Sequence, residues 1–285
     1  MEIKKMIRKE KIVTVSDVKA AIEEIAPLSL QEPWDNSGLI IGFENETVEK
    51  ILTCLELNEA VAEEAVAAGV DMVITHHPLI FGGIKAITDG SAQGRTMMKL
   101  MKSGISVYSC HTPFDKIRGG NNDMIAELLD LSSVKNLKGD DVESPSKMAD
   151  RMDEADIGRI GKLKKPMSFM DFIAAAADKL NMSIRDFRMV GDLDSEITTI
   201  GICTGAGADL IEMAAAAGCQ LMITGDVKYH EAQSAKDLGI CVLDAGHYGT
   251  EKFFAANMKK KLDKELDGKA EVIASEVDID PFMTV

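Results

Sequence analysis

The sequence predicts an α/β protein made of two duplicated α/β halves with mostly parallel sheets. Short apolar runs typical of strands alternate with helical patterns along most of the 285 residues, which favours a parallel sheet covered by helices on both faces. The chain also repeats itself at one constant offset: ILTC at 51–54 matches IGIC at 200–203, and VIT at 73–75 matches MIT at 222–224. Two facing copies of one unit create a cleft between them, and ligand sites favour such clefts.

The first half is predicted from its apolar periodicity and its glycines. Ser16 is placed to cap a helix over 17–25, which the following Ala-Pro pair ends. Gly69 closes a second helix, and a third ends at Gly104. Strands are expected at 50–57, 72–75 and 105–109, and helices at 17–25, 58–69 and up to 97–104.

The second half begins in a segment of different character. Residues 131–165 are charged and weakly periodic, so we expect either a domain junction or an edge hairpin there. Beyond it, a helix is predicted at 168–180 and strands at 197–205, 221–224 and 240–244. We therefore assign 1–130 to the first half, joined by the C-terminal segment 252–285, and 131–251 to the second half, with a short charged junction at about 135–165.

The composition excludes several classes of partner. Lys and Arg number 32 against 47 Asp and Glu, a net charge of −15, so the averaged surface repels nucleic acid and anionic lipid. No uncharged run is long enough to span a bilayer, which predicts a protein without a membrane partner. The five cysteines are odd in number and form no C-x-x-C pair, so we expect reduced core residues in a cytoplasmic protein.

The histidines are few and similarly placed. Each lies beyond a predicted strand: His76, His77, His111, His230 and His247. Because the carboxyl ends of parallel strands lie along one edge of an open sheet, the five imidazoles are expected to converge. A single histidine of this kind is more often a hydrogen-bonded loop residue, and for His111 or His230 alone that interpretation is favoured.

Two carboxylates accompany the histidines at helical spacing. His111 precedes Asp115 by four residues and His247 precedes Glu251 by four, so both members of each pair can face one way. Imidazoles and carboxylates without a thiolate suit zinc, iron, manganese or cobalt. The sequence therefore predicts a metal site in the cleft.

The adjacency of His76 and His77 indicates how many ions such a site holds. Neighbouring side chains at a strand end diverge, so the two imidazoles are expected to hold one ion each, with Asp115 or Glu251 bridging. Two divalent ions about 3.5 to 4 Å apart can clamp the attacking and leaving oxygens of a hydrolytic reaction.

Two glycine-bearing stretches allow more than one interpretation. TGAG at 204–207 is either a phosphate-binding turn or a tight strand-to-helix turn, and the missing third glycine of a dinucleotide fingerprint favours the tight turn. RGGNND at 118–123 is either an anion nest or a turn with an asparagine helix cap, and the cap is the default. No G-x-S-x-G motif supports a serine nucleophile, and Cys110 is expected to be buried.

Seven motifs together resemble the NGG-interacting-factor-3-like family, whose members are often called GTP cyclohydrolase 1 type 2. They are PWDNSGLIIG, ITHHPLIF, HTPFD, GGNND, TGAG, ITGDVKYHEA and GHYGTE, in that order from Pro33 to Glu251. The resemblance implies a duplicated α/β fold, a dinuclear metal centre in the cleft and a ring-shaped homohexamer. Some members carry a large domain between the halves, whereas this chain has only the short charged segment.

The resemblance also implies roles for particular residues. His111 and His230 would line the cleft and face the metal ions or the substrate. The metal ligands would be His76, His77, Asp115, His247 and Glu251.

These observations support one leading hypothesis and two rivals. The leading one is a hydrolase with two divalent ions per chain that acts on a nucleotide-like small molecule, in which His111 or His230 moves protons and Lys228 either neutralises substrate charge or is simply solvated. The second is a non-catalytic metal-binding or scaffold ring protein. The third is a nucleotide-binding module that uses TGAG.

Overall fold

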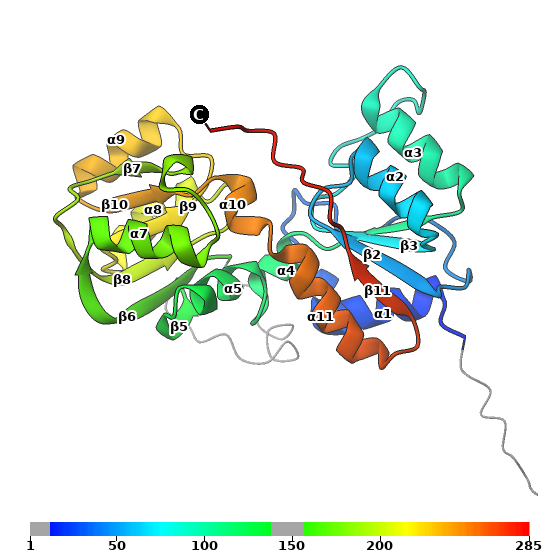
Figure 1. Cartoon of the computed structure of the whole chain (residues 1–285), viewed down its shortest axis with the longest axis horizontal. Coiled ribbons are helices and arrows are strands. Elements are labelled where there is room, and N and C mark those ends of the chain that lie inside the picture. The colour runs from blue at the N-terminus through cyan, green and yellow to red at the C-terminus, as the bar shows by residue number, and fades with distance from the viewer. Residues whose placement is uncertain (1–11, 138–156, 285) are drawn as a thin grey trace, which may run out of the picture.

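The computed structural model describes residues 12–137 and 157–284, and it confirms an α/β fold with two separate sheets (Figure 1). The first sheet has five strands in the spatial order β1-β4-β3-β2-β11. Their bounds are Gly38–Ile41 for β1, Ser106–Ser109 for β4, Met72–Thr75 for β3, Lys50–Cys54 for β2 and Glu271–Ala274 for β11. β11 comes from the C-terminal end of the chain and pairs in parallel with β2, so this sheet joins two distant parts of the sequence.

The second sheet has six strands in the order β5-β6-β8-β9-β10-β7. Their bounds are Ser132–Asn136 for β5, Arg159–Ser168 for β6, Glu196–Ile202 for β8, Leu221–Thr224 for β9, Cys241–Asp244 for β10 and Arg188–Val190 for β7. Strands β8, β9 and β10 are parallel, as are β2, β3 and β4 in the first sheet. Each sheet also has a short antiparallel strand at one edge: β1 pairs with β4, and β7 pairs with β10. Duplicated halves are expected to share such a feature.

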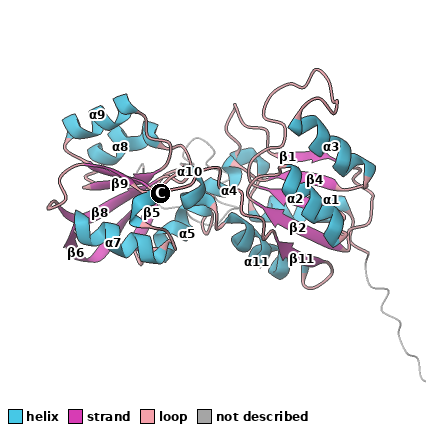
Figure 2. Ribbon diagram, turned by 45° about the horizontal axis from the view of Figure 1, so that its top comes forward, coloured by secondary structure: helices cyan, strands magenta, loops and turns pink. Residues whose placement is uncertain are grey.

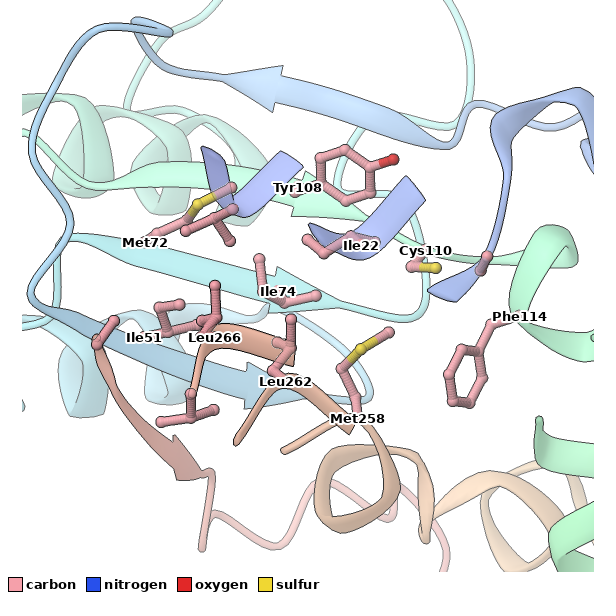
Figure 3. Close-up of a cluster of buried hydrophobic side chains, with 14 of the residues drawn as sticks. Ile22, Ile51, Met72, Ile74, Tyr108, Cys110, Phe114, Met258, Leu262 and Leu266 are labelled. Atoms are coloured by element: carbon pink, nitrogen blue, oxygen red, sulfur yellow. The ribbon is translucent and has the colours of Figure 1, made fainter. Parts of the chain in front are cut away.

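Helices cover both faces of the first sheet. On one face, α1 (Val15–Ile25) and α11 (Phe254–Leu266) pack against strand residues such as Ile51 and Ile74, and Figure 3 shows Ile22, Met258 and Leu262 meeting there. On the other face, α2 (Glu59–Ala68) and α3 (Ala92–Lys102) pack against the alternate strand residues, including Leu52, Val73 and Val107. Because the central strands are buried on both sides, apolar residues follow one another in β2 and β3 instead of alternating with polar residues.

The second sheet is covered in the same way (Figure 2). Helices α5 (Asn121–Leu128) and α7 (Phe169–Lys179) pack on one face with Ile200 and Ile223, and α8 (Ile211–Ala216) and α9 (Tyr229–Leu238) pack on the other with Met222 and Val242. Two five-residue helices, α4 (Thr112–Lys116) and α10 (His247–Glu251), lie between the sheets (Figure 1). Single 3-10 turns occupy Leu28–Leu30, Ile184–Asp186 and Ala208–Leu210.

The ends of several elements differ from the sequence prediction. The first helix is capped by Thr14 instead of Ser16, because the Thr14 hydroxyl accepts the Asp17 amide while the Asp17 carboxylate accepts the Thr14 amide. The predicted strand 50–57 ends at Cys54, although Leu55 and Leu57 stay buried in the turn that follows. Gly69 does close α2, in the left-handed conformation.

The charged segment at 131–165 contributes an edge pair to the second sheet. β5 and the start of β6 pair antiparallel, with β5 at the sheet edge, while residues 138–156 lie outside the described residues. Within the described ranges, every helix is too short or too polar to cross a membrane.

Candidate metal centre

Most of the predicted site residues lie at the carboxyl ends of parallel strands and at the two short helices between the sheets. His76 and His77 follow β3 directly, and their amides donate to the carbonyls of Cys54, the last residue of β2, and of Leu55, the next residue. His111 precedes α4, which carries Asp115. The five residues of α10 begin with His247 and end with Glu251, so both side chains face the same side, one helical turn apart.

The structure brings six of these side chains into three overlapping groups, in each of which the candidate ligand atoms lie within 4.8 Å of one another. The groups are His77, His247 and Glu251; His76, Asp115 and Glu251; and His76, His77 and His111. Glu251 is shared by the first two groups, and its carboxylate is buried. The donor set is imidazole and carboxylate only, which suits divalent ions such as zinc, iron, manganese or cobalt.

The two oxygens of Glu251 face different partners. Oε2 lies 2.9 Å from His77 Nε2 and 3.0 Å from His247 Nε2. Oε1 lies 3.6 Å from His76 Nε2, which is itself 3.5 Å from Asp115 Oδ1. The cluster therefore has two sides joined by one carboxylate, and the adjacent His76 and His77 belong to opposite sides.

The Nδ1 atom of every imidazole in the cluster donates a hydrogen bond to an oxygen atom. His77 Nδ1 donates to Glu56 Oε2 at 2.7 Å and His247 Nδ1 donates to Asp226 Oδ2 at 2.8 Å. His111 Nδ1 donates to Asp35 Oδ1 at 2.8 Å, and His76 Nδ1 donates to the Cys110 carbonyl at 2.9 Å. These bonds fix each ring with Nε2 as the available ligand atom, a pattern common around protein-bound metals.

The buried charges perturb one another strongly. Burial lowers the pKa of the His77 imidazole, but hydrogen bonds to the Glu251 and Glu56 carboxylates outweigh it and raise the pKa to about 10. Burial raises the pKa of Asp115. Burial acts in the same direction on Glu251, but the facing His76 and His247 imidazoles hold its pKa well below the usual value. Such a set of interacting titratable groups in a cleft is typical of a functional site.

Sequence reasoning missed the residues that support the cluster. Glu56, Asp226 and Asp35 hold the imidazoles, yet each is an ordinary acidic residue in a loop. Asp35 also accepts the hydroxyls of Ser37 and Thr112, and although burial raises its pKa, the hydrogen bonds from His111 and Thr112 lower it below the usual range. The only signal was the WDNSG motif, whose local pattern indicated a turn.

The glycine-bearing stretches 204–207 and 118–123 contact the carboxylates of the site. Gly205 has φ +65°, and a Cβ there would lie 2.3 Å from Glu251 Oε1, so the TGAG stretch forms a tight turn against the carboxylate. The Gly205 and Gly207 amides donate to threonine hydroxyls within the protein, which leaves neither for a phosphate. Asn121 is not a helix cap: its side chain donates to Asp115 Oδ1 at 2.9 Å, while Gly120 occupies the cap position.

His230 lies apart from the cluster. It is exposed in the first turn of α9, and its ring contacts Tyr229. Among the described residues, four of the five predicted histidines converge, whereas His230 lies in the first turn of α9 with its side chain exposed.

A cavity of about 670 Å³ opens over the cluster between the two halves. His77, His111 and Trp34 line it from the first half, and Thr204 and Leu210 line it from the second. A neighbouring cavity of about 910 Å³ is lined by Asp226 and, like the first cavity, by His247. The arrangement defines a class of protein: a duplicated α/β fold with a histidine and carboxylate cluster in the cleft between its halves.

Comparison with known proteins identifies the family. Residues 13–281 match the family model described as Duf34/NIF3 (NGG1p interacting factor 3), so the chain belongs to this family. A Clostridium perfringens protein named GTP cyclohydrolase 1 type 2 homolog is 35% identical over 268 residues, which cover 94% of this chain and 98% of the relative. A Helicobacter pylori protein named GTP cyclohydrolase 1 type 2 is 34% identical over 241 residues, which cover 85% and 88%.

Solved structures agree with this assignment. The crystal structure of a Bacillus cereus protein related to NIF3 superposes with a TM-score of 0.87 at 25% identity, covering 96% of this chain and all of that one. Reduced HcgD from Methanocaldococcus jannaschii superposes with a TM-score of 0.75 at 27% identity, covering 93% and 98%. The matches span both halves, so the two-sheet arrangement belongs to the fold of the family.

Proposed function

We propose that this protein binds two divalent metal ions per chain and uses them as a hydrolase on a nucleotide-like small molecule. The carrying observation is the position of Glu251, whose two carboxylate oxygens face separate groups of ligand atoms. One ion would be held by His77, His247 and Glu251, and the other by His76, Asp115 and Glu251. When bound, such ions supply Lewis acidity and activate water for hydrolysis.

The remaining residues of the cleft would orient the substrate and move a proton. His111 borders both ion sites, and its Nδ1 is held by Asp35, so its Nε2 is the atom that can give or take a proton. We assign this role to His111 alone, since His230 is exposed on α9. The names of the Clostridium perfringens and Helicobacter pylori relatives favour a nucleotide such as GTP as the first substrate to test.

The test measures metal content and turnover in the same preparations. Protein purified without a histidine tag is expected to hold two ions per chain by elemental analysis and to convert at least one member of a panel of nucleotides and phosphoesters. His77→Ala and Glu251→Ala should lose both properties. Lys228→Ala should keep both, because Lys228 lines the neighbouring cavity and does not line the cavity over the cluster.

Two results would overturn the proposal in different ways. Two bound ions without turnover of any panel member would favour the non-catalytic alternative, a metal-binding or scaffold protein. Protein that still binds no metal after incubation with zinc, iron, manganese and cobalt would contradict the proposed metal centre itself. The ring-shaped homohexamer implied by the resemblance is checked separately, by measuring the mass of the particle in solution.

A further inference from the structure

Two large aromatic side chains at the wall of the cleft are exposed to solvent. Trp34, the only tryptophan in the sequence, is 56% exposed, and Phe81 is 55% exposed. Their ring centroids lie 5.9 Å apart and their planes differ by 29°, so they form a continuous, nearly parallel aromatic surface. Both residues line the cavity above the metal cluster.

This aromatic surface is held in place by hydrogen bonds between loops. The Asn36 side chain donates to the Ile80 carbonyl at 2.6 Å, which ties the loop of Trp34 to the loop of Phe81. The Gln93 side chain donates to the Leu79 carbonyl at 2.5 Å. A surface fixed before a ligand arrives loses little conformational entropy on binding, which favours affinity.

The aromatic surface is also adjacent to the metal cluster. The His111 ring meets both rings edge-on, with centroid distances of 5.8 Å to Trp34 and 6.0 Å to Phe81. On its other side the His111 ring lies 5.7 Å from His77. A flat ring stacked on Trp34 and Phe81 would therefore place its edge beside His111 and the candidate metal ligands.

The charges around the cavity favour a ring over a phosphate. Five carboxylates line it: Glu32, Glu56, Asp115, Asp209 and Glu251. Among the described lining residues none is lysine or arginine, so a phosphate group could meet only imidazoles or bound metal ions there. A neutral planar ring has no such requirement, because stacking on aromatic side chains needs only its π-face.

We propose that Trp34 and Phe81 form the subsite that binds a planar heteroaromatic ring, such as a purine base, next to the metal centre. This proposal deepens the proposed function and rests on it for the metal centre beside the ring. It names the part of the substrate that the protein recognises, and it assigns binding roles to two residues outside the ligand set.

Trp34 provides a direct test, since the fluorescence of the only tryptophan reports on this subsite. Guanosine is titrated into the metal-loaded protein, with excitation at the red edge of indole absorption, where guanosine barely absorbs. Saturable quenching is expected with guanosine and none with ribose 5-phosphate, which lacks an aromatic base. Phe81→Ala should weaken the guanosine Kd about tenfold, and Phe81→Tyr should restore it.

Matched controls keep the test specific. Phe43→Ala removes an aromatic residue that is 77% exposed but does not line the cavity, and it should leave the guanosine Kd unchanged. Metal content should be the same in all the Phe variants. Trp34→Ala, measured by calorimetry because it lacks the fluorophore, should weaken guanosine binding as Phe81→Ala does.

Three outcomes would overturn the proposal. They are no quenching by guanosine, an unchanged guanosine Kd in Phe81→Ala, and tryptophan emission that responds to protein dilution and not to guanosine, as at an interface between chains.

The same measurements distinguish failure of the ring subsite from failure of the proposed hydrolase function. Guanosine binding that depends on Phe81, without turnover of any substrate, supports the ring subsite and counts against the hydrolase. Turnover of a purine nucleotide with the same KM in Phe81→Ala does the reverse.

Discussion

The orientation of each imidazole in the cluster depends on an acidic residue or carbonyl at its Nδ1. Glu56 holds His77 and Asp226 holds His247, each by a hydrogen bond shorter than 3 Å. The carboxylate keeps the ring in the tautomer whose Nε2 can bind a cation and raises the basicity of that nitrogen. The strength of the metal site should therefore depend on residues that do not touch the ions.

Removing one such residue should weaken metal binding. Glu56→Ala is expected to lower the affinity for divalent ions by roughly 10- to 100-fold, measured by competition with a chromophoric chelator. Glu63→Ala is the matched control, because Glu63 is an acidic residue of α2 that forms an ion pair with Lys99 of α3 and contacts no imidazole of the cluster. Equal metal affinities in the two variants would show that the His77 ring needs no such support.

Gly205 offers a second test at the scale of one methyl group. Gly205→Ala places a Cβ 2.3 Å from Glu251 Oε1 in a backbone conformation with φ +65°, so it should displace the carboxylate and reduce the bound metal. Gly218→Ala has a similar φ of +81° but no atom within 4 Å of the added Cβ. Both substitutions should cost about 1 kcal/mol of stability through backbone strain, measured by denaturant unfolding.

Only Gly205→Ala should lose metal, because only its methyl group meets a ligand. Full metal content in Gly205→Ala would mean that Glu251 is free to move and is not held against the turn. Low metal content in both variants would point to general loss of structure.

At the scale of the elements, prediction from the sequence succeeded where local patterns decide the outcome. β3 and β9 lie at the predicted residues, since four consecutive apolar or β-branched residues are buried on both faces of a sheet. Ser16 failed as a cap because Thr14, two residues earlier, forms both bonds of a capping box with Asp17. The asparagine cap expected within 118–123 is wrong, because Gly120 caps α5 and the Asn121 side chain donates to Asp115 of α4, a contact that helix propensity does not encode.

Burial in and beside the strands determines how reactive the cysteine thiols are. All five cysteines are free and buried, within or directly beside the strands and their turns. Burial raises the pKa of Cys54 and of Cys219 to about 12, so both thiols stay protonated and unreactive near neutral pH. Folded protein should therefore react slowly with an alkylating reagent at neutral pH, and protein in denaturant should react at all five cysteines, as counted by mass spectrometry. Rapid labelling of the folded protein would contradict this.

Across the whole molecule, the candidate metal centre brings together parts of the chain that belong to different sheets. His76, His77 and Asp115 come from elements of the first sheet, whereas α10 follows β10 of the second. Another bond joins the same parts: the buried Arg159 of β6, in the second sheet, donates to the Lys116 carbonyl of α4, which follows β4 of the first sheet. Ions bound here should stabilise the molecule as one unit.

Metal removal should therefore lower the thermal stability. At a free ion concentration of 100 Kd, one site that forms only in the folded protein adds about 2.7 kcal/mol, so chelator-treated protein should melt several degrees below metal-loaded protein in calorimetry. Glu251→Ala is the control, and its Tm should not respond to added metal. An identical Tm with and without metal in the unchanged protein would contradict a site built from both halves.

The α/β class, the internal repeat and the residue types of the cluster follow from the sequence alone, because apolar periodicity and four-residue spacing are local properties of the chain. The tertiary structure decided which of these residues meet. In the folded protein His230 lies outside the cluster, and the two carboxylate oxygens of Glu251 face different imidazoles. The fold also places Glu56, Asp35 and Asp226 within hydrogen-bond distance of the imidazoles. Partners such as His77 and Glu251, 174 residues apart, are joined only by the packing of helices and strands in three dimensions, which no local pattern contains.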